Sequence, residues 1–148
     1  MHNIKRFDTK PYMTIGIIVV NIIVFVLMSI SGSTLDAQYM AAHGAMYPEY
    51  IKDGQYWRLL TSMFMHFGLM HILNNMVVLG AVGQIVEKAM GHVKLLITFL
   101  VSGICGSVLS YIVMLYNNDF AVSAGASGGD IWSGGSTCVD SYSKQRLL

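Results

Sequence analysis

Three long stretches of the sequence contain no charged side chain. They cover residues 11–35, 59–86 and 95–118, and the shortest of them has 24 residues. About 20 consecutive apolar residues are enough to cross a bilayer as a helix, and a helix satisfies its own backbone polar groups. Each stretch therefore predicts one transmembrane helix, and the expected fold class is an all-α, multi-pass membrane protein.

The composition agrees with a membrane protein. Of the 148 residues, 54% are hydrophobic and only 11% are charged, which is too apolar for an ordinary soluble domain. The net charge of +1 gives no indication of nucleic-acid binding, so membrane lipid is the expected surrounding partner. The two cysteines, Cys105 in an apolar stretch and Cys138 in a polar tail, suggest neither a disulfide framework nor a metal site.

The basic residues predict the orientation of the helices. With residues 1–10 in the cytoplasm, five basic residues of the short loops lie inside (Lys5, Arg6, Lys10, Lys88, Lys94) and two lie outside (Lys52, Arg58). This follows the positive-inside rule, so we expect a cytoplasmic N-terminus and a location in the cell (plasma) membrane. A cleaved signal peptide ending near Ser33 is the alternative, but its apolar core would be unusually long.

The second stretch carries polar side chains that are expensive in a membrane, namely His66, His71, Asn74 and Asn75. His71 and Asn75 are four residues apart, so on a helix they lie within about 40° of each other. His66 is about 140° away, which turns it to another face or places it before the helix. Two donors on one face can stabilise the oxyanion of an acyl-transfer reaction, at about 3 kcal/mol each.

Two other uses of these histidines remain open. One is a metal site, but the sequence has no H-E-x-x-H pattern and no nearby acidic third ligand, so neither a metal nor a cofactor is expected. The other is structural, with histidines and asparagines forming hydrogen bonds between helices.

A serine near the end of the apolar region is the candidate nucleophile. Ser127 lies in the segment Gly-Ala-Ser-Gly-Gly, with Gly125 before it and Gly128 after it. Small neighbours let a carbonyl approach the hydroxyl and the adjacent backbone N–H groups. The G-x-S-x-G elbow of soluble hydrolases requires a preceding strand, which this sequence does not predict. Small residues that only let helices pack closely are the alternative.

The third stretch has a row of small residues at three- and four-residue spacing: Ser102, Gly103, Gly106, Ser107 and Ser110. Such a row allows a neighbouring segment to approach closely. We therefore expect this helix to be central in the packing.

Four segments together resemble the rhomboid family of intramembrane serine proteases. They read Tyr-Trp-Arg-Leu-Leu-Thr at 56–61, Phe-Met-His-Phe-Gly-Leu-Met-His-Ile-Leu-Asn-Asn at 64–75, Gly83 to Glu87, and Gly-Ala-Ser-Gly at 125–128. The resemblance implies a six-helix core that cleaves transmembrane substrates. Residues 11–129 would be a partial rhomboid protease domain, with three complete transmembrane helices and the start of a fourth.

The same resemblance implies roles for individual residues. Ser127 would be the nucleophile, and its backbone N–H would form the oxyanion hole with the side chains of His71 and Asn75. Glu87 would join helix ends in a structural role. Supporting positions around the active site would be His66, Gly125, Gly128, Trp57 and Arg58, with Trp57 and Arg58 in a loop lying partly in the outer leaflet.

Residues 130–148 depart from the family pattern, because they form a polar tail with no apolar span. The family's base is a histidine on the sixth helix, whereas none of the five histidines here follows Ser127. A serine without its base loses on the order of 10⁴ to 10⁶ in rate, so this chain is expected to be inactive. One inserted nucleotide near the codon of Gly129 would explain the tail, since codons read one nucleotide later permit an apolar helix.

Two alternatives to a protease remain. One is a non-catalytic rhomboid-like protein that binds client helices in the membrane. The other is an unrelated helical membrane protein whose polar residues only pack between helices.

Overall fold

The computed structural model describes residues 10–118 and 121–125. Every regular element in these residues is a helix, and strand pairing is limited to one isolated bridge. The elements are α1 (Tyr12–Ser31), α2 (Ala37–Ala42), α3 (Pro48–Lys52), α4 (Arg58–Thr61), the 3₁₀ turn η1 (Ser62–Phe64), α5 (Gly68–Met90) and α6 (His92–Asn117). Helices α1, α5 and α6 are long and apolar enough to cross a membrane. The predicted all-α, multi-pass fold class is thus confirmed. The predicted start of a fourth helix and the tail at 130–148 lie outside the described residues.

The second apolar stretch does not form the single helix predicted from its length. It begins with α4 and η1, continues in extended backbone at Met65 and Phe67, and becomes α5 only at Gly68. Gly68 has a φ of +71°, a backbone conformation that side chains other than glycine rarely adopt. Helix α5 then runs past Glu87 to Met90 and ends at Gly91, which has a φ of +88°.

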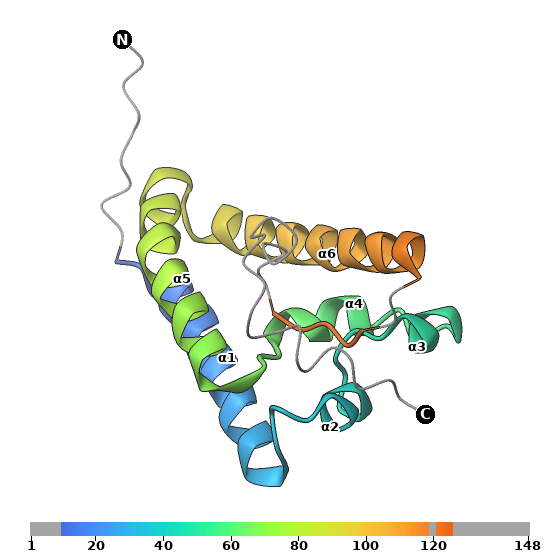
Figure 1. Cartoon of the computed structure of the whole chain (residues 1–148). Coiled ribbons are helices and arrows are strands. Elements are labelled where there is room, and N and C mark those ends of the chain that lie inside the picture. The colour runs from blue at the N-terminus through green and yellow to red at the C-terminus, as the bar shows by residue number, and fades with distance from the viewer. Residues whose placement is uncertain (1–9, 119–120, 126–148) are drawn as a thin grey trace.

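Helices α1 and α5 lie side by side and pack closely at one glycine (Figure 1). A Cβ atom at Gly83 would lie 2.9 Å from Thr14 Cγ2. One turn further along α5, the carboxylate of Glu87 accepts hydrogen bonds from Met13 N (2.8 Å), Thr14 N (2.9 Å) and Thr14 Oγ1 (2.5 Å). It also bonds His92 Nδ1 at the start of α6. Glu87 therefore caps the first turn of α1 and joins three helix ends, as the resemblance implied.

The segment between α1 and α5 is organised around a buried arginine. The Arg58 side chain is 4% exposed, and its Nη1 donates to the carbonyl oxygens of Ala41 and Ala45. Its guanidinium lies 4.4 Å from the ring centre of Tyr50 and 4.7 Å from that of Trp57. Carbonyl oxygens and ring faces compensate the buried charge, so Arg58 ties α2, α3 and α4 into one unit.

The small residues of α6 do not all face the same neighbour. Gly103 and Ser107 are buried against η1, where a Cβ atom at Gly103 would overlap Met63 and Ser107 Oγ lies 3.3 Å from Ser62 Oγ. Ser102 lies on the exposed side. The row therefore does allow a close approach, and at Gly103 and Ser107 the neighbour is η1. Figure 1 shows α6 extending from the end of α5 above α4.

Candidate active site

The segment 121–125, just ahead of the candidate nucleophile, is fixed by three backbone hydrogen bonds. Ser123 and Met46 form an antiparallel bridge, with Ser123 N donating to Met46 O at 2.8 Å and Met46 N donating to Ser123 O at 2.9 Å. Gly125 N donates to Ser62 O at 2.8 Å. The chain after α6 is thereby held against both the α2–α3 connection and η1, as the orange-red segment beside α4 in Figure 1 shows.

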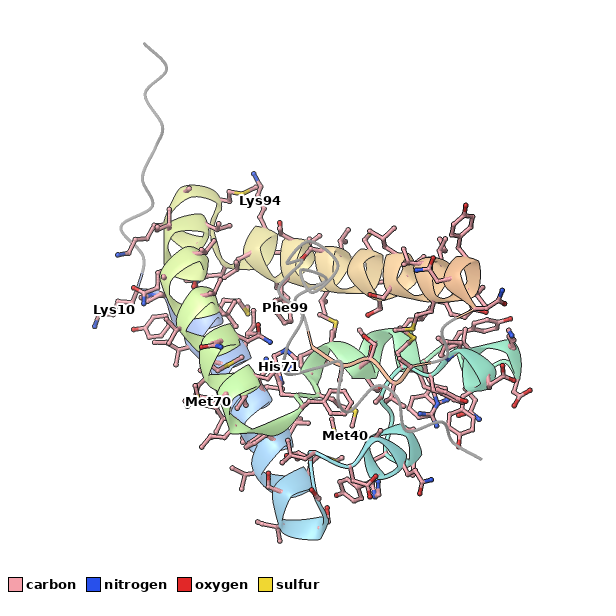
Figure 2. The ribbon with its side chains drawn as sticks, viewed as in Figure 1. Lys10, Met40, Met70, His71, Lys94 and Phe99 are labelled. Carbon is pink, nitrogen blue, oxygen red and sulfur yellow. The ribbon has the colours of Figure 1, made fainter. Side chains whose placement is uncertain are left out.

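Gly125 lies directly against the two predicted oxyanion residues. A Cβ atom at Gly125 would be 2.9 Å from His71 Cε1 and Nε2 and 3.6 Å from Asn75 Nδ2. Gly125 also has a φ of +109°, so both its backbone and its surroundings favour glycine. Figure 2 shows His71 on the inner side of α5, toward the shorter helices. The fold thus brings Gly125, His71 and Asn75 together from segments about 50 residues apart in the sequence.

The amide of Asn75 is poised to bind an oxygen atom. Its Nδ2 is buried and has no hydrogen-bond partner among the described residues. A buried donor without an acceptor is unfavourable, and such groups in native proteins commonly mark functional sites or bound water. An oxyanion is the acceptor that would fit this donor in an acyl-transfer enzyme.

His66 contacts His71 from outside helix α5. It lies before α5, which is one of the two positions that the sequence predicted for it, and it is 1% exposed. Its ring meets the ring of His71 edge-on, with centroids 5.2 Å apart and planes at 70°. Burial, and secondarily the neighbouring His71, lowers the pKa of His66 to about 4. His66 is therefore neutral near pH 7, and its ring packs against that of His71.

The remaining predicted residues differ in their environment or lie outside the described part of the chain. Trp57 is 52% exposed whereas Arg58 is buried, so the two neighbours have opposite environments. Ser127 and Gly128 lie outside the described residues. No group of three His, Cys, Asp or Glu side chains that could hold a metal ion occurs in the parts that are described.

Two residues that hold the site cannot be found from the sequence. Met46 and Ser62 fix the segment before Ser127 through main-chain groups, which every residue type carries. Arg58 contributes indirectly, because it binds the carbonyl oxygen of Ala45, the residue before Met46.

Substituting Gly125 with alanine is expected to lower the free energy of unfolding by about 1–3 kcal/mol, because a positive φ and a contact with the His71 ring are both unfavourable for alanine. Denaturant titration followed by circular dichroism in detergent measures this. Gly54→Ala is the matched control, since Gly54 has a φ of +90° but nothing within 4 Å of its Cβ position. Equal losses in the two variants would show that the contact with His71 has no energetic effect.

Comparison with known proteins identifies relatives of this chain. The Rhomboid domain family model matches residues 53–147, a range that runs past Gly129 into the polar tail. The chain is 36% identical over 119 residues to Rhomboid protease GluP of Bacillus subtilis (strain 168), covering 80% of this chain and 22% of that protein.

Two further relatives give similar values. Identity to Rhomboid protease GlpG of Pectobacterium atrosepticum is 33% over 131 residues, covering 88% of this chain and 46% of that protein. Identity to RHOMBOID-like protein 7 of Arabidopsis thaliana is 38% over 101 residues, covering 68% of this chain and 30% of that protein. The chain spans less than half the length of each of these three relatives. No solved structure matches it significantly.

Proposed function

Because this chain belongs to the rhomboid family, we propose that it carries the nucleophile and the oxyanion hole of an intramembrane serine endopeptidase. The observation that supports this most directly is the contact of Gly125 with His71 and Asn75. Gly125 is two residues before Ser127, so the candidate hydroxyl is close in the chain to the residue that contacts both proposed donors. The substrates we propose are transmembrane segments of other proteins.

The proposed chemistry gives each of these groups a role. The Ser127 oxygen attacks the carbonyl carbon of the scissile peptide bond, and its proton passes to a base and then to the departing amine. The negative oxygen of the tetrahedral intermediate accepts hydrogen bonds from the Ser127 backbone N–H, His71 and Asn75. Water then attacks the acyl-enzyme, the base takes its proton, and the Ser127 hydroxyl is regenerated.

The mechanism also needs a base, which the family places after the nucleophile, on its sixth helix. Residues 1–148 contain no histidine at that place. The five histidines are His2, His43, His66, His71 and His92, and all precede Ser127. We therefore propose that the 148-residue polypeptide alone hydrolyses peptides very slowly, and that a one-nucleotide insertion near the Gly129 codon produced the tail. The DNA sequence tests the insertion: if the shifted frame encodes no apolar span and no later histidine, the insertion did not occur.

Labelling with a fluorophosphonate tests the proposed nucleophile. We expect the gene product with the corrected frame to be labelled at Ser127, and the variant Ser127→Ala to lose the label. The 148-residue chain is expected to show no appreciable labelling. Failure of the corrected protein to label would contradict the protease assignment, and strong labelling of the 148-residue chain would contradict the need for a later histidine.

The second candidate function is binding of client helices without hydrolysis, although the presence of Ser127 together with His71 and Asn75 counts against it. It predicts no labelling in either form of the protein. Substrate transmembrane segments would then be recovered uncleaved in complex with it.

A further inference from the structure

A buried asparagine in the middle of α1 has an unsatisfied oxygen atom. The Asn21 side chain is 1% exposed, and its Nδ2 donates to Ile17 O at 2.8 Å within the same helix. Its Oδ1 is buried and has no hydrogen-bond partner among the described residues. This costs more inside a membrane than at a surface, because hydrocarbon offers no alternative partner. Asn21 therefore needs a donor that fits inside the protein.

Asn21 faces α5 at the level of the candidate site. The three buried residues of α1 are Thr14, Ile17 and Asn21, which lie along one side of the helix. On this side Thr14 meets Gly83, and the neighbouring Ile18 lies 3.8 Å from the Cβ position of Gly80. The two helices run antiparallel, so this register places Asn21 at the height of residues 76–77 of α5, one or two residues along the helix from Asn75.

Other buried atoms without a partner in the described part of the chain include Asn75 Nδ2 and His66 Nε2. His66 Nδ1 lies 3.3 Å from the carbonyl oxygen of Phe64, so Nδ1 is the protonated nitrogen and Nε2 is an acceptor. Asn75 thus offers one donor, and Asn21 and His66 offer one acceptor each. Helix α1 contacts η1 as well as α5, so the segments that carry these groups are neighbours.

We propose that buried water occupies the interface between α1, α5 and η1 and is held there by Asn21. A water molecule has two O–H groups for Asn21 Oδ1 and His66 Nε2, and a lone pair for Asn75 Nδ2. Two to four polar partners are what a buried water requires, and such waters commonly complete groups that the protein leaves unsatisfied.

The consequence for catalysis rests on the proposed function. Peptide hydrolysis inside a membrane consumes one water molecule per turnover, and this water would lie beside an oxyanion donor. Asn21 is then a positioning residue that acts through water and not by contact with the substrate.

X-ray radiolytic footprinting of the 148-residue chain in detergent tests the water site without requiring activity. Radiolysis converts bound water to hydroxyl radical in place, so buried side chains next to water become oxidised. The reporters are Ile17 of α1 and Ile72 of α5, which are 5% and 4% exposed. The reference is Ile51 of α3, a side chain of the same type that is 2% exposed. We expect the reporters to be oxidised severalfold faster than Ile51.

Three variants separate the oxygen atom from the space it occupies. Asn21→Leu and Asn21→Ala are expected to reduce oxidation of the reporters to the rate of Ile51, whereas Asn21→Asp, which keeps an acceptor, retains it. Asn74→Leu is the matched control on the exposed side of α5 and leaves the rates unchanged. Circular dichroism confirms that each variant is folded. If Asn21→Leu does not fold, the oxidation rates of Asn21→Ala test the proposal.

Reporters as slow as Ile51 in the unmodified chain would overturn the proposal, as would undiminished oxidation in Asn21→Ala. Neither result bears on whether Ser127 is the nucleophile, because the footprint does not depend on fluorophosphonate labelling. The two proposals therefore fail separately.

Discussion

Replacing Asn75 with alanine is expected to lower the turnover number of the frame-corrected protein about 10²- to 10³-fold, and His71→Ala is expected to have an effect of similar size. Each change removes a donor from the oxygen that becomes negatively charged only in the transition state. The loss should therefore appear in kcat, with little change in KM. Cleavage of a transmembrane substrate in proteoliposomes measures both constants.

Asn74→Ala is the matched control for this prediction. Asn74 is the same residue type one position earlier in α5, but its side chain is exposed, whereas Asn75 meets Gly125. We expect the control to retain the activity of the unmodified protein. Equal losses in Asn74→Ala and Asn75→Ala would mean that these changes act on folding or on substrate docking, and the oxyanion assignment would be wrong.

The second large effect concerns stability. Glu87→Gln is expected to lower the free energy of unfolding of the 148-residue chain by about 3–5 kcal/mol, because the amide keeps one acceptor oxygen but turns N–H groups toward donors. Those donors are the backbone N–H groups of Met13 and Thr14, the Thr14 hydroxyl and His92. Denaturant titration followed by circular dichroism in detergent micelles gives the free energy.

Glu49→Gln is the control, because it makes the same chemical change at the surface. Glu49 lies 3.3 Å from Lys52 in an exposed ion pair, which contributes at most about 1 kcal/mol. If Glu87→Gln cost no more than Glu49→Gln, the carboxylate would not be the cap that joins α1, α5 and α6.

The sequence by itself determined the membrane helices and the pairing of His71 with Asn75. Both follow from local properties: an uncharged stretch longer than a bilayer is thick predicts a span, and a four-residue spacing on a helix places two side chains on one face. The linked motifs also predicted the family, which the family model confirmed. The role of Ser127 stays a prediction.

Only the tertiary structure showed that the second apolar stretch is broken before Gly68, that Gly125 meets His71, and that Met46 and Ser62 hold the segment before Ser127. It also showed that Asn21 is buried without a partner for its oxygen. The physical reason is the same in each case. These features depend on main-chain groups and on contacts between residues far apart in the chain, and neither leaves a periodic pattern of side chains in the sequence.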